Sequence, residues 1–161
     1  ACPIVRELAP LMPDADPSEI AEKIKEKTSA LDVREILQFL VTSGLLVKTG
    51  KGSYEQTEKS LKGSKTSIPP AIRSMNKNMA ALAEKSIERD SVIERNFSGV
   101  TMGIDESAYA RIVDVINDCR KKVIDIAREC QNINQVYRLN LQLFPLTDKV
   151  NKRVCKKGRQ P

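Results

Sequence analysis

Residues 44–57 read GLLVKTGKGSYEQT, and this stretch decides the fold class of the chain. Apolar residues recur at helical spacing over 33–41, which predicts a helix immediately before it. Gly44 favours the left-handed backbone in which many helices end. LLVKT and SYEQT predict two strands, and Gly50 and Gly52 allow the positive φ angles of a tight turn between them. A helix followed by a hairpin is the order in which a winged helix-turn-helix ends.

Two capping patterns predict the helices that precede this stretch. Asp16 stands three residues before Glu19, and Ser29 stands three residues before Asp32. In such pairs the first side chain accepts a hydrogen bond from the backbone of the new helix, and the second side chain reaches back. With a short helical stretch at 3–12, the sequence predicts three helices before the hairpin.

The rest of the chain predicts a second unit built from a helix, a strand, a long helix and a strand. The first strand is expected at 97–104, and the second at 136–144, where apolar and polar residues alternate. We therefore expect an α+β fold. It has a winged-helix-like helical domain with a β-hairpin at 1–60, a helix–strand–long helix–strand unit at 61–147, and a disordered basic tail at 148–161.

The second unit is the predicted site of oligomerisation. Two strands alone leave open sheet edges, which folded proteins usually pair or cover. Either these strands join others of the same chain or two copies complete a sheet together, and the second case predicts a homodimer. The candidate interface residues are apolar. One lies on the helix before the hairpin, off its core face, and the others lie on the long helix or on the last strand: Phe39, Tyr109, Ile112, Ile116, Tyr137, Leu139 and Leu141.

The net charge of +6 comes from the end of the chain. The sequence holds 27 Lys and Arg against 21 Asp and Glu, and residues 149–161 contain six of the basic residues and no acidic one. The remaining 21 basic residues balance the 21 acidic ones, so the body of the protein is neutral. A tail of this composition can contact nucleic-acid phosphates, or it can simply be a solvated end.

Side chains that carry out chemistry are scarce. The chain has no His, which is the commonest general base and metal ligand, and its four Cys show no metal-binding spacing. The glycines of TGKGS lie between two strands rather than between a strand and a helix, so they do not form a phosphate loop. We expect a non-enzymatic protein without metal or cofactor. Unpaired cysteines and the absence of a long apolar run predict a cytoplasmic protein that does not enter a membrane.

Four residues are candidates for DNA contact. Arg34 and Gln38 lie on the exposed face of the helix before the hairpin, and Lys48 and Lys51 lie in the hairpin. The same helix face carries two carboxylates against one guanidinium, a net charge of −1 that disfavours its insertion into a groove. The hairpin lysines are the stronger candidates, although lysines on a hairpin also discourage edge pairing.

Several blocks of sequence occur in the order found in one known family. These blocks are PIVREL, LVTSGLL, Y-x-Q-T, PPAIRSMNKNM, FSGVTM and VYRLNLQLFPL. Together they resemble the Fibrobacter paralogous family of bacterial proteins, whose conserved region is described as a domain of unknown function. The resemblance covers about residues 3–147 and leaves out the basic tail. Family members usually carry an aromatic-rich stretch before PIVREL, and its absence here predicts that the chain is the C-terminal part of a longer protein.

The resemblance implies a transcriptional regulator in which a helix-turn-helix ahead of this region reads DNA. We therefore expect the chain to be the regulatory and oligomerisation module of such a protein. Two alternatives stay open. In one, the winged helix binds DNA directly through Lys48, Lys51 and the basic tail. In the other, the chain is a protein-interaction or small-ligand sensing module.

Overall fold

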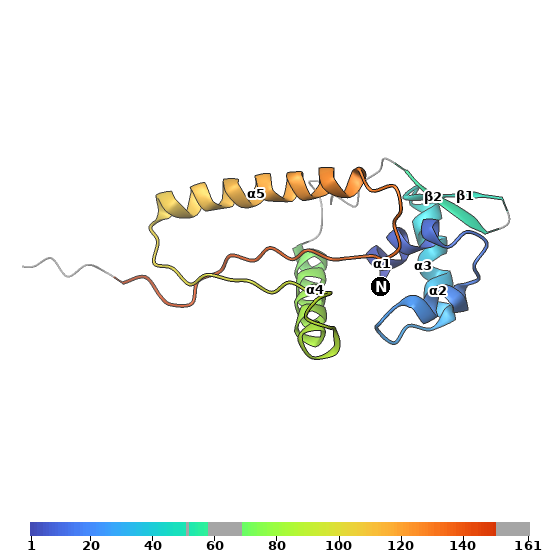
Figure 1. Cartoon of the computed structure of the whole chain (residues 1–161), viewed down its shortest axis with the longest axis horizontal. Coiled ribbons are helices and arrows are strands. Elements are labelled where there is room, and N and C mark those ends of the chain that lie inside the picture. The colour runs from blue at the N-terminus through green and yellow to red at the C-terminus, as the bar shows by residue number, and fades with distance from the viewer. Residues whose placement is uncertain (51, 58–68, 151–161) are drawn as a thin grey trace, which may run out of the picture.

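The computed structural model describes residues 1–50, 52–57 and 69–150, and Figure 1 shows the arrangement of their elements. In chain order these are α1 (Cys2–Leu8), the 3-10 helix η1 (Ala9–Leu11), α2 (Pro17–Lys23), α3 (Ala30–Thr42), β1 (Leu46–Thr49), β2 (Ser53–Gln56), α4 (Pro69–Arg89) and α5 (Glu106–Arg128). Helices together with a hairpin confirm the α+β class. The described part of the basic tail ends at residue 150, so most of that prediction lies outside the described residues.

Local hydrogen bonds set the starts of α2 and α3, as the capping patterns predict. The Asp16 carboxylate accepts from the backbone N–H of Glu19 at 3.0 Å, while the Asp16 N–H donates to the Glu19 carboxylate at 2.7 Å. The Ser29 hydroxyl accepts from the backbone N–H of Asp32 at 3.1 Å, and the Ser29 N–H donates to the Asp32 carboxylate at 2.9 Å. Each pair satisfies N–H groups that a helix start would otherwise leave without a partner.

The hydrophobic core lies in the first part of the chain, between α1, α2, α3 and the hairpin. Helix α3 supplies one buried side chain per turn, and the shorter elements close around that stripe. The core residues are Val5, Ala9, Ile20, Ile24, Val33, Leu37, Leu40, Leu45 and Leu46. All of them precede the end of β1, so the first 57 residues contain the whole of this cluster.

The hairpin forms as the glycine pattern predicts. Strands β1 and β2 are antiparallel, with Lys48 opposite Tyr54. Gly50 and Gly52 have φ angles of +75° and +111°, and Gly44, with a φ of +67°, follows the end of α3. After β2 the Thr57 hydroxyl donates to the carbonyl of Gly44 at 2.7 Å, which ties the end of the hairpin to the end of α3.

Helices α4 and α5 lie outside this core. Figure 1 shows α5 as a separate rod that drawn-out coil segments connect at both of its ends. Asp105 caps α5 by accepting from the backbone N–H of Ala108 at 2.8 Å. Met79 of α4 is the only large hydrophobic side chain after the hairpin that is buried among the described residues, and α5 has no buried residue.

The two strands expected in the second half are absent. Among the described residues the sheet contains only β1 and β2, and the segments 97–104 and 136–144 are coil. This part of the prediction was wrong because alternation of apolar and polar residues reports only that one side of a segment can be buried. A strand also needs a neighbour that completes its ladder of hydrogen bonds, and a single chain provides none here.

Candidate protein and nucleic-acid interfaces

The exposed face of α3 carries the residues expected to read DNA. Arg34 and Gln38 are both exposed there, as predicted. The neighbouring Asp32 stays ionised, because hydrogen bonds from the hydroxyl and the backbone N–H of Ser29 lower the pKa of its carboxyl group. Glu35 is also exposed, so Arg34 faces solvent beside two carboxylates. The local field around this face does not favour approach to a phosphate backbone.

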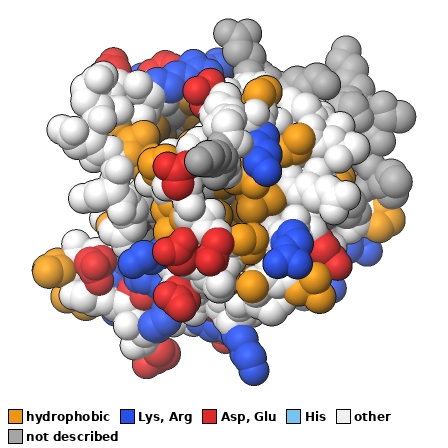
Figure 2. Space-filling model, turned by 90° about the vertical axis from the view of Figure 1, so that its right-hand side faces the viewer, with side chains coloured by type: hydrophobic (Ala, Val, Ile, Leu, Met, Phe, Trp, Pro, Cys, Tyr) orange, Lys and Arg blue, Asp and Glu red, His pale blue; other side chains and the backbone are white. Residues whose placement is uncertain are grey.

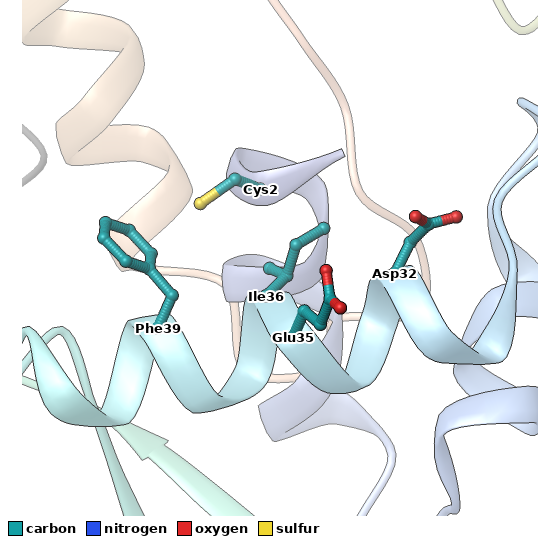
Figure 3. A pocket seen from close by; sticks show the side chains of 5 residues that line it. All are labelled: Cys2, Asp32, Glu35, Ile36 and Phe39. Atoms are coloured by element: carbon teal, nitrogen blue, oxygen red, sulfur yellow. The ribbon is translucent and has the colours of Figure 1, made fainter.

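A shallow hollow of about 300 Å³ lies beside this face, between α1 and α3 (Figure 3). Phe39, Ile36, Glu35 and Asp32 line it from α3, and Cys2 lines it from α1. Burial raises the pKa of the Cys2 thiol, which keeps that group protonated and uncharged. The hollow therefore combines two carboxylates with apolar walls. It suits a cationic or aliphatic side chain of another protein better than a phosphate.

The hairpin presents one described lysine to solvent. Lys48 is exposed on β1, while Lys51 and the later lysines Lys59, Lys62 and Lys65 lie outside the described residues. The side of the protein in Figure 2 shows basic side chains interspersed with acidic ones rather than a basic field. Lys48 is the only Lys or Arg among the described residues of the hairpin, 46–50 and 52–57.

Apolar side chains remain exposed along α5 and along both coil segments of the second half. Val115 and Ile126 on α5 are 67% and 65% exposed, and Tyr137 in the last segment is 68% exposed. On the segment before α5, Phe97 and Val100 are also open to solvent. These apolar side chains from 97–104, α5 and 136–146 are referred to below as the apolar surface. Soluble monomers seldom leave an apolar area of this extent uncovered.

The predicted interface residues divide into two groups. Ile112 and Ile116 are partly buried on the first half of α5. The others are exposed and still open to a partner: Phe39, Tyr109, Tyr137, Leu139 and Leu141. Phe39 is 56% exposed on α3 and lines the hollow, so the structure separates it from the residues of the apolar surface.

An ion-pair network that the sequence did not reveal joins the loop after α2 to the end of α4. Lys25 contacts Asp90 at 2.8 Å, and Glu26 contacts Lys85 at 2.7 Å and Arg89 at 3.0 Å. Arg89 also contacts Asp90 at 3.0 Å. The hydrogen bond from Arg89 is the main cause that lowers the pKa of Asp90, and the hydrogen bond from Lys85 does the same for Glu26. Both carboxylates are therefore ionised at neutral pH.

A second set of contacts fastens the end of the chain to the helices. The Asn140 amide donates to the backbone carbonyl of Met79 at 2.9 Å, and Lys149 contacts Glu106 at 2.6 Å. Asn140 thus contacts α4 from within the coil segment that was expected to form a strand. The segment is positioned by a side chain rather than by a β-ladder.

In the part of the chain that the structure describes, no group of three Cys, Asp or Glu side chains could hold a metal ion. No described helix combines the length and the apolar character needed to cross a membrane.

A family model described as "Domain of unknown function (DUF4423)" matches residues 2–146. That match covers most of the chain, and the protein belongs to this family. No curated protein and no solved structure gave a match to the chain.

Proposed function

We propose that this member of the DUF4423 family is a non-enzymatic assembly module of a bacterial transcriptional regulator that works in the cytoplasm. In this proposal a separate helix-turn-helix segment reads DNA, and the present chain brings subunits together. The regulatory role rests on the resemblance to the Fibrobacter paralogous family. The assembly role rests on one observation, the apolar surface of the second half, which remains exposed among the described residues.

The extent of that surface supports an assembly. Its exposed side chains come from three segments, 97–104, α5 and 136–146, and several of them leave more than half of their surface in water. Leaving this area in water has a free-energy cost that burial against a partner removes. The homodimer expected from the sequence is the simplest arrangement that covers it.

Analytical ultracentrifugation of the full chain tests the assembly role. We expect a dimer or larger species over the micromolar range, with little binding of an apolar dye because the apolar surface is covered. A species that stays monomeric at the highest accessible concentration and binds the dye strongly would refute the proposal. The dye reading matters because a monomer that binds little dye would mean that another part of the same chain covers the apolar surface.

Direct DNA binding through the hairpin is the second candidate function. The observation in its favour is the exposed position of Lys48 on β1, in a sequence that places Lys51 in the adjoining turn. A gel-shift series with the full chain tests it, using the double variant Lys48→Glu, Lys51→Glu. The matched control is Lys23→Glu on α2, away from the hairpin. Specific binding by the wild type that only the hairpin variant abolishes would favour this function over the first.

A protein-interaction or small-ligand sensing role is the third candidate, and the acidic hollow beside Phe39 is the feature that favours it. Native mass spectrometry of the purified chain would detect a retained metabolite. The composition of the hollow predicts that any such ligand carries a positive charge next to an apolar group.

A further inference from the structure

We propose that α5 pairs with the α5 of a second copy of this chain through a heptad seam. The seam consists of apolar residues spaced alternately three and four positions apart: Tyr109, Ile112, Ile116, Cys119, Val123 and Ile126. This inference rests on the assembly function proposed above and names both the partner and the contact. A repeat of three and four residues has a mean period of 3.5, which keeps the seam facing a partner helix when two helices wind around each other.

The chain itself leaves most of this seam open. Ile112 and Ile116 are partly buried, but every residue of α5 from Asp118 onward is exposed, including Val123 and Ile126. An isolated helix of this length gains its stability in water mainly from burying an apolar face. The exposed half of the seam is therefore apolar but is not packed against any other described part of the chain.

The distribution of charge on α5 favours a second copy of this chain as the partner. Lys121 pairs with Asp118 at 3.0 Å and Arg128 pairs with Asp125 at 3.5 Å, both within the helix and off the seam. The seam carries no charge, so it offers nothing to an acidic or basic partner. What complements it is another uncharged helix face with the same repeat, and a second copy supplies that face.

The residues beside the seam allow two copies to approach. In a parallel pair in register, Arg120 of one helix meets Val115 of the other, and Lys122 meets Ala127. Each of these flanking contacts contains a single charge beside an apolar residue, so no like charges meet. The long stems of Arg120 and Lys122 can cover the edge of the seam while their charged ends stay in water.

Cys119 provides a direct test, because it lies near the middle of the seam. In a parallel pair in register, each Cys119 faces the Cys119 of the other helix across the seam. In the full chain with Cys2, Cys130 and Cys155 replaced by Ser, Cys119 is the only thiol. We expect mild oxidation to yield a covalent dimer on a non-reducing gel, and Cys119→Ser to abolish it.

Substitutions on the same helix complete the test. Ile126→Glu places a charge in the seam and should weaken dimerisation at least roughly thirtyfold, the effect of losing an interface hot spot. Arg111→Glu is the matched control, since Arg111 is exposed on α5 but is polar and lies off the seam. It should change the dissociation constant less than about threefold. Both side chains are exposed in the single chain, so neither substitution should disturb the core of the first unit, which urea unfolding checks.

The outcomes separate this inference from the proposed function. A dimer that forms no Cys119 cross-link and is equally sensitive or insensitive to the two glutamate variants would overturn the α5 pairing and leave the assembly function standing. A wild-type chain that is monomeric throughout would overturn both. A cross-linked dimer that Ile126→Glu disrupts and Arg111→Glu does not would establish the seam.

Discussion

Leu40→Ala should remove much of the stability of the first structural unit. Leu40 is fully buried, with 0% of its surface exposed, and lies on α3 at the centre of the core. Truncation of a buried Leu costs about 3 kcal/mol, since it loses transfer free energy and leaves a cavity. A unit of this size has a total stability of roughly 3–8 kcal/mol. With a urea slope of about 1–1.5 kcal/mol/M, the unfolding midpoint should fall by roughly 2–3 M.

Tyrosine fluorescence provides a local assay for this unit. The chain has no Trp and three Tyr, and of these Tyr54 is partly buried against the same core. Replacing Tyr109 and Tyr137 by Phe leaves Tyr54 as the single reporter. The control is Leu31→Ala, because Leu31 is 60% exposed on the same helix. If both alanine variants shifted the midpoint equally, the assignment of the core would be refuted.

Three further outcomes follow from local contacts. Ser29→Ala should lower the stability of the first unit by about 1 kcal/mol, measured by urea unfolding, because α3 loses its N-cap. Gly44→Ala should cost about 1 kcal/mol in the same assay, since a side chain disfavours its φ of +67°. Glu26→Gln should lower the midpoint at neutral pH and not in acid. The pKa of Glu26 is lowered in the folded chain. The stability that its ionised carboxylate contributes is therefore complete above the carboxyl pKa of the unfolded chain, and it is lost as the pH falls through the lowered pKa of the folded chain. Equal deficits at both pH values would argue against the ion pairs with Lys85 and Arg89.

The features that the sequence predicted correctly are those set by nearby residues. The starts of α2 and α3 depend on pairs three residues apart, and both pairs form the expected hydrogen bonds. The hairpin turn depends on two glycines, and both adopt positive φ. Short-range hydrogen bonds and backbone preferences act in the same way whatever the rest of the chain does.

The features that were missed or misjudged depend on residues far apart. The ion-pair network joins residues about sixty positions apart, and nothing distinguishes Lys25 or Asp90 in the sequence from other solvated charges. The strand expected at 136–144 is absent for a related reason. A strand must pair with a neighbouring strand, and the sequence of the segment itself does not show whether one is present. Tyr109, Ile112 and Ile116 of α5 were identified as interface candidates, but the exposure of the second half of this helix became visible only in three dimensions.

The position of the core along the chain has a consequence for synthesis. Every residue of the core cluster lies within the first 46 residues, and Thr57 closes the hairpin onto the end of α3. A chain made from its N-terminus can therefore complete this unit before the ribosome has added α5, as domains generally fold in order of synthesis. The apolar surface of the second half therefore emerges after a unit that is already folded. An unfinished chain that still lacks α5 exposes less apolar area to other chains, which limits aggregation during synthesis.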